Sequence, residues 1–566
     1  MMKIAAALLM FAVSLAGASD RMRLITDPSA GDQTDADSFS GTFELLGVPV
    51  RRDPPSHPSL RGAGFICLPN AAAGQVPVKD RAKLLSWVRG GKVLLTDGAS
   101  FVTEALGLKT APAHPVFGVE DRLDKTLPLR WPDRPIVAAF DATEDDATRW
   151  LYVDSETAKP LALLIRYGKG RVVVFAGAYD DLTGQGYARY PDLPFLLVHD
   201  LNLRPPRSAA LAEAYFDPGN RSGRLDAERL AAQWRRWGLR RVYAAAWYAG
   251  TKDPADPFDY GSLLKAAHRN GIAVDAWFEW PHVTMGFWDQ NPDCREKTAA
   301  LTDAHLDWRY LVNLDSAACW NGIAAEAHAL LGRYPWDGVD VAEVYLEPVI
   351  GADAGPEGWT PMNAEARSYF QKDLGFDPML LFQPGSERFR QAHPRAMDAF
   401  YTARIRLNTA RVQRAVEFAA AEGKGRASWD PVLTFIDVSA HPEMGGLIGV
   451  DTPAHLDFAK RFGLTPQIED PYTEWALGPT RYDRLVERYG RIWRNPYGVD
   501  INVVAAHDLE QAQYPTEKPA GTEFFQLWRA AYGRGNRVCV YAEDTVREMD
   551  WEVLPYVMGA ASSRRP

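Results

Sequence analysis

The stretch GVDVAEVYLE, residues 338–347, is a short apolar run of the kind that forms a buried strand, and it ends in acidic residues. Helical patterns with apolar residues at i, i+3 and i+4 separate it from seven further runs of this kind. These are LAEAYFD (211–217), RRVYAAAWY (240–248), IAVDAWFEW (272–280), PVLTFIDV (431–438), TPQIED (465–470), INVVAAHD (501–508) and RVCVYAED (537–544). Eight strand and helix units over residues 208–566 predict an α/β protein with a (β/α)8 TIM barrel. The alternative is a doubly wound open sheet, but no GxGxxG motif follows a strand.

Acidic side chains stand at the ends of seven of the eight runs. In chain order the ends carry Asp217, Trp247 with Tyr248, Glu279, Glu343 and Glu347, Asp437, Glu469 with Asp470, His507 with Asp508, and Glu543 with Asp544. The carboxyl ends of barrel strands converge on one face, where catalytic residues lie. A single Asp after a strand is more often a helix N-cap, but Glu is a weak cap and several of these residues precede long loops.

The first twenty residues, MMKIAAALLMFAVSLAGASD, have the pattern of a secretory signal peptide. They combine an early lysine, an apolar run and a small-residue site, and we expect residues 1–18 to be removed near Ala18. The apolar run is too short to span a bilayer. We therefore expect a secreted or periplasmic protein without a membrane span. A net charge of -10 argues against nucleic acid as a partner.

Residues 22–203 form a separate α/β pattern, which ends at the punctuation Arg204-Pro205-Pro206-Arg207. GFICLPN (64–70) and KVLLTDG (92–98) alternate with the helical segments 78–91 and 100–107, and residues 161–177 predict a β-hairpin. This order resembles the glutamine-amidotransferase-like domains, flavodoxin-like in fold, that accompany some sugar-processing barrels. The resemblance implies a cysteine after the strand 92–98, where this chain has Thr96-Asp97-Gly98-Ala99-Ser100. We therefore expect a degenerate domain that serves as a scaffold or in homo-oligomer formation, with Ser100 as a helix N-cap.

The chain has four cysteines. Cys67 and Cys539 lie in apolar runs and are expected to be buried free thiols. Cys294 and Cys319 flank one long loop region, where in an oxidising compartment they can either pair or stay free. No spacing suggests a zinc site.

The segments LLKAAHRNGIAVDAWFEWP (263–281) and YLVNLDSAACWNGIAAEAHALLGRYPWDGVDVAEVYLEP (310–348) resemble the glycoside-hydrolase-like barrels of secreted bacterial proteins. His268, Arg269, Gly271 and Trp277 carry the first pattern, and the second leads through Tyr334 and Asp337-Gly338 to a strand that ends in acid. The resemblance implies that this acid is catalytic. In this chain the strand offers Ala342 followed by Glu343.

Glycoside hydrolysis needs two carboxyl groups, one protonated to assist the leaving oxygen and one ionised as nucleophile or base. We expect Glu343 to be the nucleophile or base and Glu469 the acid, by analogy with retaining α-glycosidase barrels. Asp437 is the alternative acid. Asp340 is either a second catalytic acid or a brace for a neighbouring strand.

The remaining strand-end residues are candidates for substrate binding. Glu279 is either a ligand for a sugar hydroxyl or part of an ion pair, and Glu347 either binds substrate or only ends its strand. His507 and Asp508 bind substrate or, with Glu469, a metal; no HxH or HxxxE spacing supports the metal, so no cofactor is expected. At least one of Trp247, Trp277 and Trp280 should expose its ring to a sugar. Asp217, Asp470 and Glu543 complete the set of candidates.

Two functions remain open from the sequence. The first is a glycoside hydrolase acting on a polysaccharide or oligosaccharide outside the cytoplasm. The second is a barrel without catalysis that binds glycans or assists polysaccharide assembly. Acids at seven strand ends favour the enzyme, because a binding protein gains little from paired carboxylates.

Overall fold

The computed structural model describes residues 22–26, 34–177, 181–182, 187–208, 212–220, 226–246, 258–306, 308–348, 351–503, 515–533 and 536–558. The expected signal peptide, Trp247, Tyr248, His507 and Asp508 lie outside the described residues.

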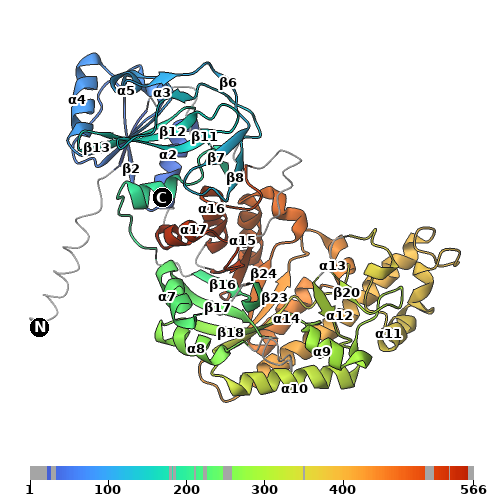
Figure 1. Cartoon of the computed structure of the whole chain (residues 1–566). Coiled ribbons are helices and arrows are strands. Elements are labelled where there is room, and N and C mark those ends of the chain that lie inside the picture. Colours follow the sequence, from blue (N-terminus) through green and yellow to red (C-terminus); the bar gives the residue numbers. More distant parts are fainter. Residues whose placement is uncertain are drawn as a thin grey trace, which may run out of the picture.

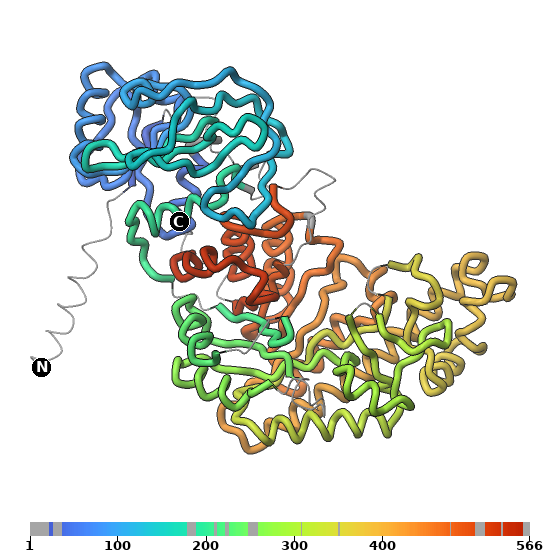
Figure 2. The backbone as a smooth tube through the Cα atoms, viewed as in Figure 1, coloured from blue at the N-terminus to red at the C-terminus, as the bar shows by residue number. Residues whose placement is uncertain are grey.

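Eight parallel strands close into a barrel in chain order, which confirms the predicted fold (Figure 1). The strands are β16 (Ala212–Phe216), β17 (Leu239–Ala245), β18 (Ala273–Phe278), β22 (Gly338–Ala342), β23 (Asp430–Ile436), β24 (Thr465–Glu469), β25 (Gly498–Asn502) and β26 (Arg537–Tyr541). Helices follow the strands, as the tube in Figure 2 traces from green to red. They are α7 (Ala227–Trp237), α8 (Tyr260–Arg269), α10 (Ala317–Arg333), α12 (Pro394–Glu422), α14 (Thr452–Phe462), α15 (Thr480–Ile492), α16 (Thr522–Tyr532) and α17 (Glu548–Val553).

The predicted bounds of the seventh and fourth strands differ most from the observed ones. The seventh strand was expected at residues 501–508 but occupies Gly498–Asn502. The residues Gly498 and Asp500 have the composition of a turn, yet Asp500 is buried because the inside of this barrel is polar. The fourth strand ends at Ala342, so Glu347 lies in the loop beyond it.

Charged side chains fill the barrel near the amino ends of its strands. Arg241 pairs with Asp275 and, at 3.0 Å, with Asp430. Arg537 pairs with Glu213 at 2.9 Å and with Asp430 at 2.7 Å. This end of the barrel is therefore closed by an ion-pair network, in which each arginine links acids from two different strands.

Residues 279–316, between β18 and α10, form an excursion from the barrel. It contains the strands β19 (His282–Val283), β20 (His305–Leu306) and β21 (Arg309–Leu311), which pair in the order β19-β21-β20, and the helix α9 (Met285–Gln290). A disulfide between Cys294 and Cys319 ties the excursion to α10, so these two cysteines pair. The other two, Cys67 and Cys539, are buried free thiols, as predicted.

A second excursion, between β22 and β23, holds α11 (Ala364–Leu374) and the long helix α12, and α13 (Pro442–Ile448) packs against it. A separate apolar core holds this lobe together, seen at the right of Figure 1. Its large members include Trp359, Phe370, Phe382 and Phe400. The helix α12 contributes to this core and also carries Arg404 and Arg411, both fully buried.

The N-terminal part is an α/β domain with a nine-stranded sheet in the order β2-β1-β3-β4-β13-β12-β11-β7-β8. Its strands are β1 (Met22–Ile25), β2 (Val50–Asp53), β3 (Phe65–Leu68), β4 (Val93–Asp97), β7 (Gly118–Asp121), β8 (Pro128–Arg130), β11 (Thr148–Asp154), β12 (Pro160–Tyr167) and β13 (Gly170–Phe175), and its longer helices are α2 (Thr34–Leu45), α4 (Val78–Arg89) and α5 (Phe101–Ala105). The strands β2-β1-β3-β4-β13 are parallel, in the flavodoxin-like order. The predicted hairpin is β12–β13. Ser100 caps α5, as predicted.

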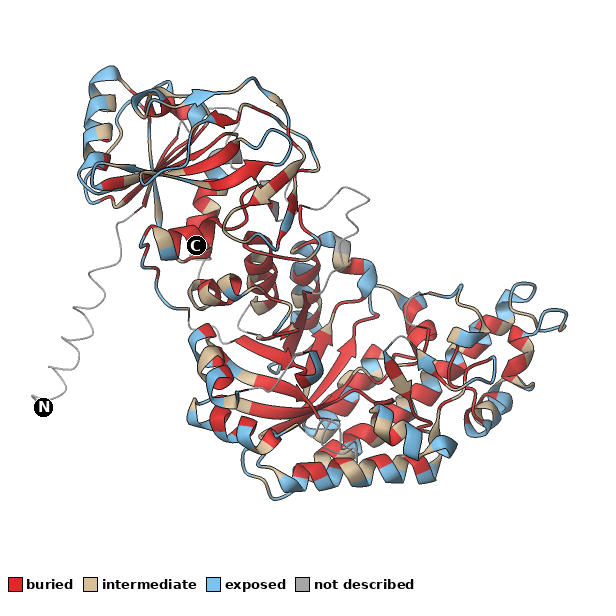
Figure 3. Cartoon of the chain, in the orientation of Figure 1, coloured by how far each residue is buried: buried red, intermediate tan, exposed pale blue. Residues whose placement is uncertain are grey.

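The N-terminal domain and the barrel share one continuous apolar core (Figure 3). The barrel helices α16 and α17 pack against the N-terminal domain. Across this contact Arg547 pairs with Asp192 at 2.6 Å, and the Thr522 N–H donates to the Pro191 carbonyl at 3.0 Å. The two parts are therefore fixed by ionic, polar and apolar contacts together.

The first testable prediction concerns Arg411 on α12, which pairs with Glu296 at 3.1 Å and with Asp315 at 2.6 Å. Arg411→Met should lower the free energy of unfolding by about 3–5 kcal/mol, because it leaves two buried carboxylates without their cation. Urea unfolding followed by circular dichroism measures the loss.

The matched control is Arg406→Met on the same helix, where an exposed pair with Asp373 is lost. Its expected cost is about 0–1 kcal/mol. Equal losses for the two variants would contradict the assignment of the Arg411 cluster as a buried anchor.

Candidate functional site

Three glutamates from different strands meet at the carboxyl end of the barrel. Glu279 follows β18, Glu343 follows β22 and Glu469 ends β24. The negative charge of Glu343 raises the pKa of both Glu279 and Glu469, so the three groups lie close together. The Tyr541 hydroxyl, at the end of β26, lies among them, since all three charges raise its pKa after burial does.

A hollow of about 220 Å³ opens beside two of these glutamates. Its wall combines acids, a cation and ring side chains, and consists of Glu279, Glu343, Glu347, Arg309, Tyr345, His282, Pro281 and Leu311. Glu343 and Tyr345 are partly exposed, whereas Glu279 is 4% exposed. A small substrate group entering this hollow would meet carboxyl groups from two strands.

Arg309 on β21 supplies positive charge to the hollow. Its guanidinium donates to the Tyr345 hydroxyl and to the Glu347 carboxylate. Burial raises the pKa of Glu279 and Glu343, and the positive charge of Arg309 opposes this rise. The first excursion therefore places the positive charge of Arg309 beside Glu279 and Glu343.

The pKa values of the three glutamates differ because their surroundings differ. Burial raises the pKa of Glu343 to about 7, against the opposing effects of Arg309 and a hydrogen bond from Tyr345. Burial and the charge of Glu343 hold the pKa of Glu469 well above its usual range, and the same causes act on Glu279. Burial and mutual repulsion thus disfavour ionisation of all three, while Arg309 and the Tyr345 hydroxyl favour the charged form of Glu343.

The backbone at Glu343 is unusual. Its φ is +49°, in the left-handed region that a non-glycine residue seldom adopts. The Glu343 N–H donates to the Thr434 carbonyl at 3.0 Å, which ties the end of β22 to β23. Backbone strain of this kind concentrates at functional sites. The preceding Ala342 faces the barrel core, so the hollow receives Glu343.

Two other acids at strand ends, Asp437 and Asp470, are held by neighbouring side chains. Asp437 is paired with Arg488 and accepts from the Tyr489 hydroxyl at 3.0 Å. Asp470 pairs with Arg481 at 3.1 Å and accepts from the Tyr482 hydroxyl.

Glu543 accepts from the Trp234 indole at 2.9 Å. The chain leaves the barrel wall after Tyr541, so Tyr541 takes the place on strand eight that was expected for Glu543. The contacts of Asp437, Asp470 and Glu543 favour structural roles.

Asp340 lies inside β22, fully buried, and accepts from the backbone N–H of Thr434 at 3.2 Å and from its hydroxyl at 2.7 Å. Burial raises its pKa well above the usual range. These contacts favour the brace over the second catalytic acid. Asp217, after β16, accepts from the Gly219 N–H at 2.7 Å and raises the pKa of Glu279, which places it beside the three glutamates.

The expected exposed indole is not Trp277 or Trp280, which are 0% and 3% exposed. The prediction that at least one of the three indoles is exposed now depends on Trp247, which lies outside the described residues. Trp277 points into the barrel, where it packs on Tyr215 with ring centroids 5.0 Å apart, and its indole N–H donates to Glu279 at 3.5 Å. It therefore positions a glutamate.

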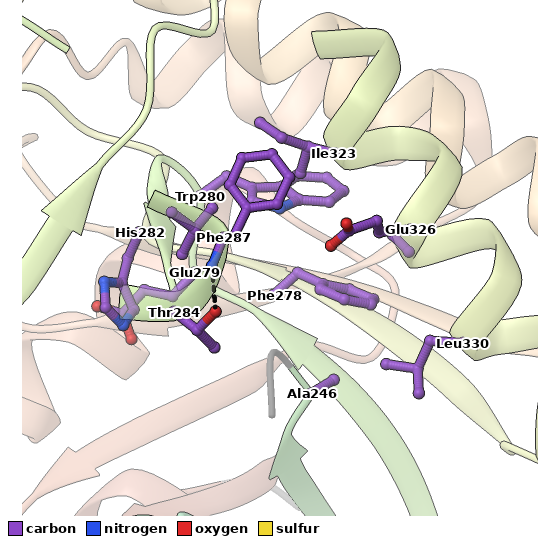
Figure 4. A pocket seen from close by; sticks show the side chains of 12 residues that line it. Ala246, Phe278, Glu279, Trp280, His282, Thr284, Phe287, Ile323, Glu326 and Leu330 are labelled. Carbon is purple, nitrogen blue, oxygen red and sulfur yellow. Dashed lines mark hydrogen bonds between the residues drawn. The ribbon is translucent and has the colours of Figure 1, made fainter. Parts of the chain in front are cut away.

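A larger hollow of about 440 Å³ lies on the other side of Glu279 and His282 (Figure 4). Its walls are mainly apolar side chains of β18, α9 and α10, including Phe278, Trp280, Phe287, Ile323 and Leu330. Trp280 stacks on Phe278 there, with ring centroids 5.2 Å apart. Glu279 and His282 thus form a partition between a polar and an apolar hollow.

Four residues of the site were not predicted from the sequence. Arg309 lies outside the eight predicted runs, and Tyr345 stood inside the run 338–347, between the two acids that were chosen, Glu343 and Glu347. Tyr541 stood inside a predicted strand, two residues before the acid that was chosen instead. Asp500 was missed because its strand was placed too late in the chain. Burial and Glu343 raise the pKa of Asp500 to about 7.

No protein-family model and no curated protein matches the chain. Solved structures with a similar fold include the β-galactosidase from Marinomonas ef1, at 11% identity and TM-score 0.40 over 58% of this chain and 53% of that chain. The catalytic domain of β-amylase from Paenibacillus polymyxa is similar at 10% identity and TM-score 0.43, over 64% of this chain and 100% of that chain. The PgaB (BpsB) glycoside hydrolase domain from Bordetella bronchiseptica is similar at 16% identity and TM-score 0.41, over 62% and 99%. The chain thus spans about half the length of the first of these proteins, and the likeness is one of fold.

Within the described ranges, no group of three or more His, Cys, Asp or Glu side chains has a geometry that would hold a metal ion. No helix in the described part of the chain has the length and apolar character needed to cross a membrane.

The second prediction concerns Asp500, whose pKa is about 7 in the folded protein because of burial and Glu343. A carboxyl group with a raised pKa stabilises the fold while it is protonated, and this contribution is lost as the pH rises from about 4 to 7. Asp500→Asn should therefore gain stability relative to the parent over this interval, up to about 4 kcal/mol above pH 7. Urea unfolding at pH 4 to 8 measures the difference, and a constant difference would contradict a buried, proton-binding Asp500.

Proposed function

We propose that the protein is a glycoside hydrolase that cleaves a polysaccharide or oligosaccharide with carboxyl groups at the mouth of its barrel. The observation that carries the proposal is the meeting of Glu343 with Glu469 and Glu279 at the barrel mouth, where burial raises the pKa of all three and Arg309 opposes the rise for Glu343 and Glu279. Two carboxyl groups in different protonation states are what this reaction requires.

In this proposal Glu343 is the ionised group that acts as nucleophile or base. Arg309 and the Tyr345 hydroxyl favour its charged form. Glu469 is the leading acid, because burial and neighbouring charges keep its proton in place. The pKa of Glu279 is also raised well above its usual range by burial, and Glu279 lines the hollow with Glu343, so it becomes the alternative acid in place of Asp437.

We further propose that the chain is exported through the signal sequence of residues 1–18 and that the N-terminal domain is a degenerate amidotransferase-like scaffold. Ser100 is engaged in capping α5, and the pKa of the Cys67 thiol is raised well above its usual range by burial. Neither group is placed as a nucleophile. The shared core with the barrel supports a structural role for this domain.

The third prediction is the effect of Glu343→Gln. It keeps the shape of the side chain but removes the charge that stabilises an oxocarbenium-like transition state, so turnover should fall by several orders of magnitude while folding is retained. A screen of polysaccharides for new reducing ends finds the substrate, and the variant is then measured on it.

Glu422→Gln is the control, because Glu422 lies at the end of α12 before β23, on the opposite face of the barrel. It should keep parental turnover. Near-normal activity of Glu343→Gln on a substrate that the parent cleaves would refute the assignment.

The fourth prediction is the pH dependence of kcat/KM. The rate should rise with pH through about 7, because Glu343 must lose its proton to act, and should fall again at higher pH when the acid ionises. Glu469→Gln should remove the upper fall and spare substrates whose leaving group needs no proton. If Glu279→Gln has this effect and Glu469→Gln does not, the acid is Glu279.

A further inference from the structure

Trp308 is a large apolar side chain that remains exposed beside the site. It lies in the turn that joins β20 to β21, and 51% of its surface is accessible. The indoles of Trp277 and Trp280 are buried by contrast. Trp308 therefore keeps a solvent-accessible apolar surface next to the polar hollow.

A ring contact and a chain neighbour place Trp308 beside the hollow. Its ring meets His282 edge to face, with ring centroids 4.8 Å apart, and His282 lines both hollows together with Glu279. The next residue, Arg309, contacts Tyr345 and Glu347 inside the polar hollow. The indole is thus one residue along the chain from the cation of the site.

His282 offers Trp308 a neutral neighbour. Its Nδ1 accepts from the Tyr310 N–H at 3.2 Å, so the ring proton is on Nε2. Burial and the charge of Arg309 lower the pKa of His282 to about 3. The contact between Trp308 and His282 is therefore one between an indole and an uncharged imidazole, and it packs one part of the indole.

The hairpin that carries Trp308 is held before any ligand binds. Tyr310 stacks on His305 with ring centroids 4.1 Å apart, and the Trp288 indole donates to the Leu311 carbonyl at 3.1 Å. The disulfide Cys294–Cys319 ties the same excursion to α10. A rigid aromatic ring binds a ligand without a large loss of conformational entropy.

We propose that Trp308 is a stacking platform for a hexopyranose unit of the substrate, next to the unit that enters the polar hollow. This inference rests on the proposed function for the class of ligand. The preferred unit presents a C–H-rich face, which packs on an indole, while its hydroxyl groups stay in water. The substrate then extends over the hairpin, so the protein favours oligosaccharides over monosaccharides.

The experiment uses the full-length Glu343→Gln protein, so that bound saccharide is not cleaved. Its probes are hexasaccharides of β-1,4-linked glucose, β-1,4-linked N-acetylglucosamine and α-1,4-linked glucose, with binding measured by isothermal titration calorimetry. For the hexasaccharide that binds, adding Trp308→Ala should weaken affinity about three- to tenfold, while Trp308→Phe should retain most of it. The matched control is Ile492→Ala, which removes another exposed apolar side chain, at the end of α15 before β25 and hence on the opposite barrel face.

A direct readout comes from 5-fluorotryptophan labelling. The fluorine signal that disappears in Trp308→Phe belongs to Trp308, and it should shift when the hexasaccharide binds. If Trp308→Ala binds as tightly as its parent and the signal does not move, the platform is refuted while the proposed hydrolase stands. Trp308-dependent binding by a protein that cleaves no glycan would refute the hydrolase and support the platform. If none of the three hexasaccharides binds, the platform is overturned.

Discussion

The guanidinium of Arg309 contacts Tyr345 and Glu347 and lowers the pKa of Glu279 and Glu343, at a place where barrel closure has gathered several acids. Parallel strands that end in Glu bring like charges together, and burial removes the water that would screen them. Burial and mutual repulsion both favour the protonated forms of these acids. Arg309 acts in the opposite sense on Glu279 and Glu343, and an unequal environment of this kind is what acid and base chemistry needs.

The two excursions from the barrel support this cation. Arg309 lies on the first excursion, which the disulfide and the Glu296–Arg411–Asp315 cluster anchor to α10 and α12. Arg404, on the same face of α12, donates to the backbone carbonyl of Glu347 at 2.7 Å. Glu347 in turn accepts from Arg309. The long helix α12 thus supports both partners of the Arg309–Glu347 ion pair, Glu347 through Arg404 and the excursion that carries Arg309 through Arg411.

The sequence predicted the barrel well because each strand is a local signal, an apolar run closed by polar residues. It predicted Glu279, Glu343 and Glu469 for the same reason, since a residue at a strand end needs no tertiary information to be placed. Arg309 and Tyr345 could not be found in this way, because their positions depend on how long loops fold back. The strand β25 was displaced because Asp500 looked like a turn residue, and only a barrel with a polar interior buries such a group. The sequence also did not predict the burial of two indoles. The side chain of Trp277 points into the barrel, whereas that of Trp280 packs on Trp320 outside it.

The continuous core between the N-terminal domain and the helices α16 and α17 has a consequence for the evolution of the chain. Those helices complete the barrel, yet their apolar sides are covered by the other domain. A barrel cut free from its partner would present this surface to water, so the two parts cannot be shuffled independently among genes. The loops after β25 and β26 share this constraint, because the Arg130 N–H donates to the Pro515 carbonyl and Arg547 pairs with Asp192.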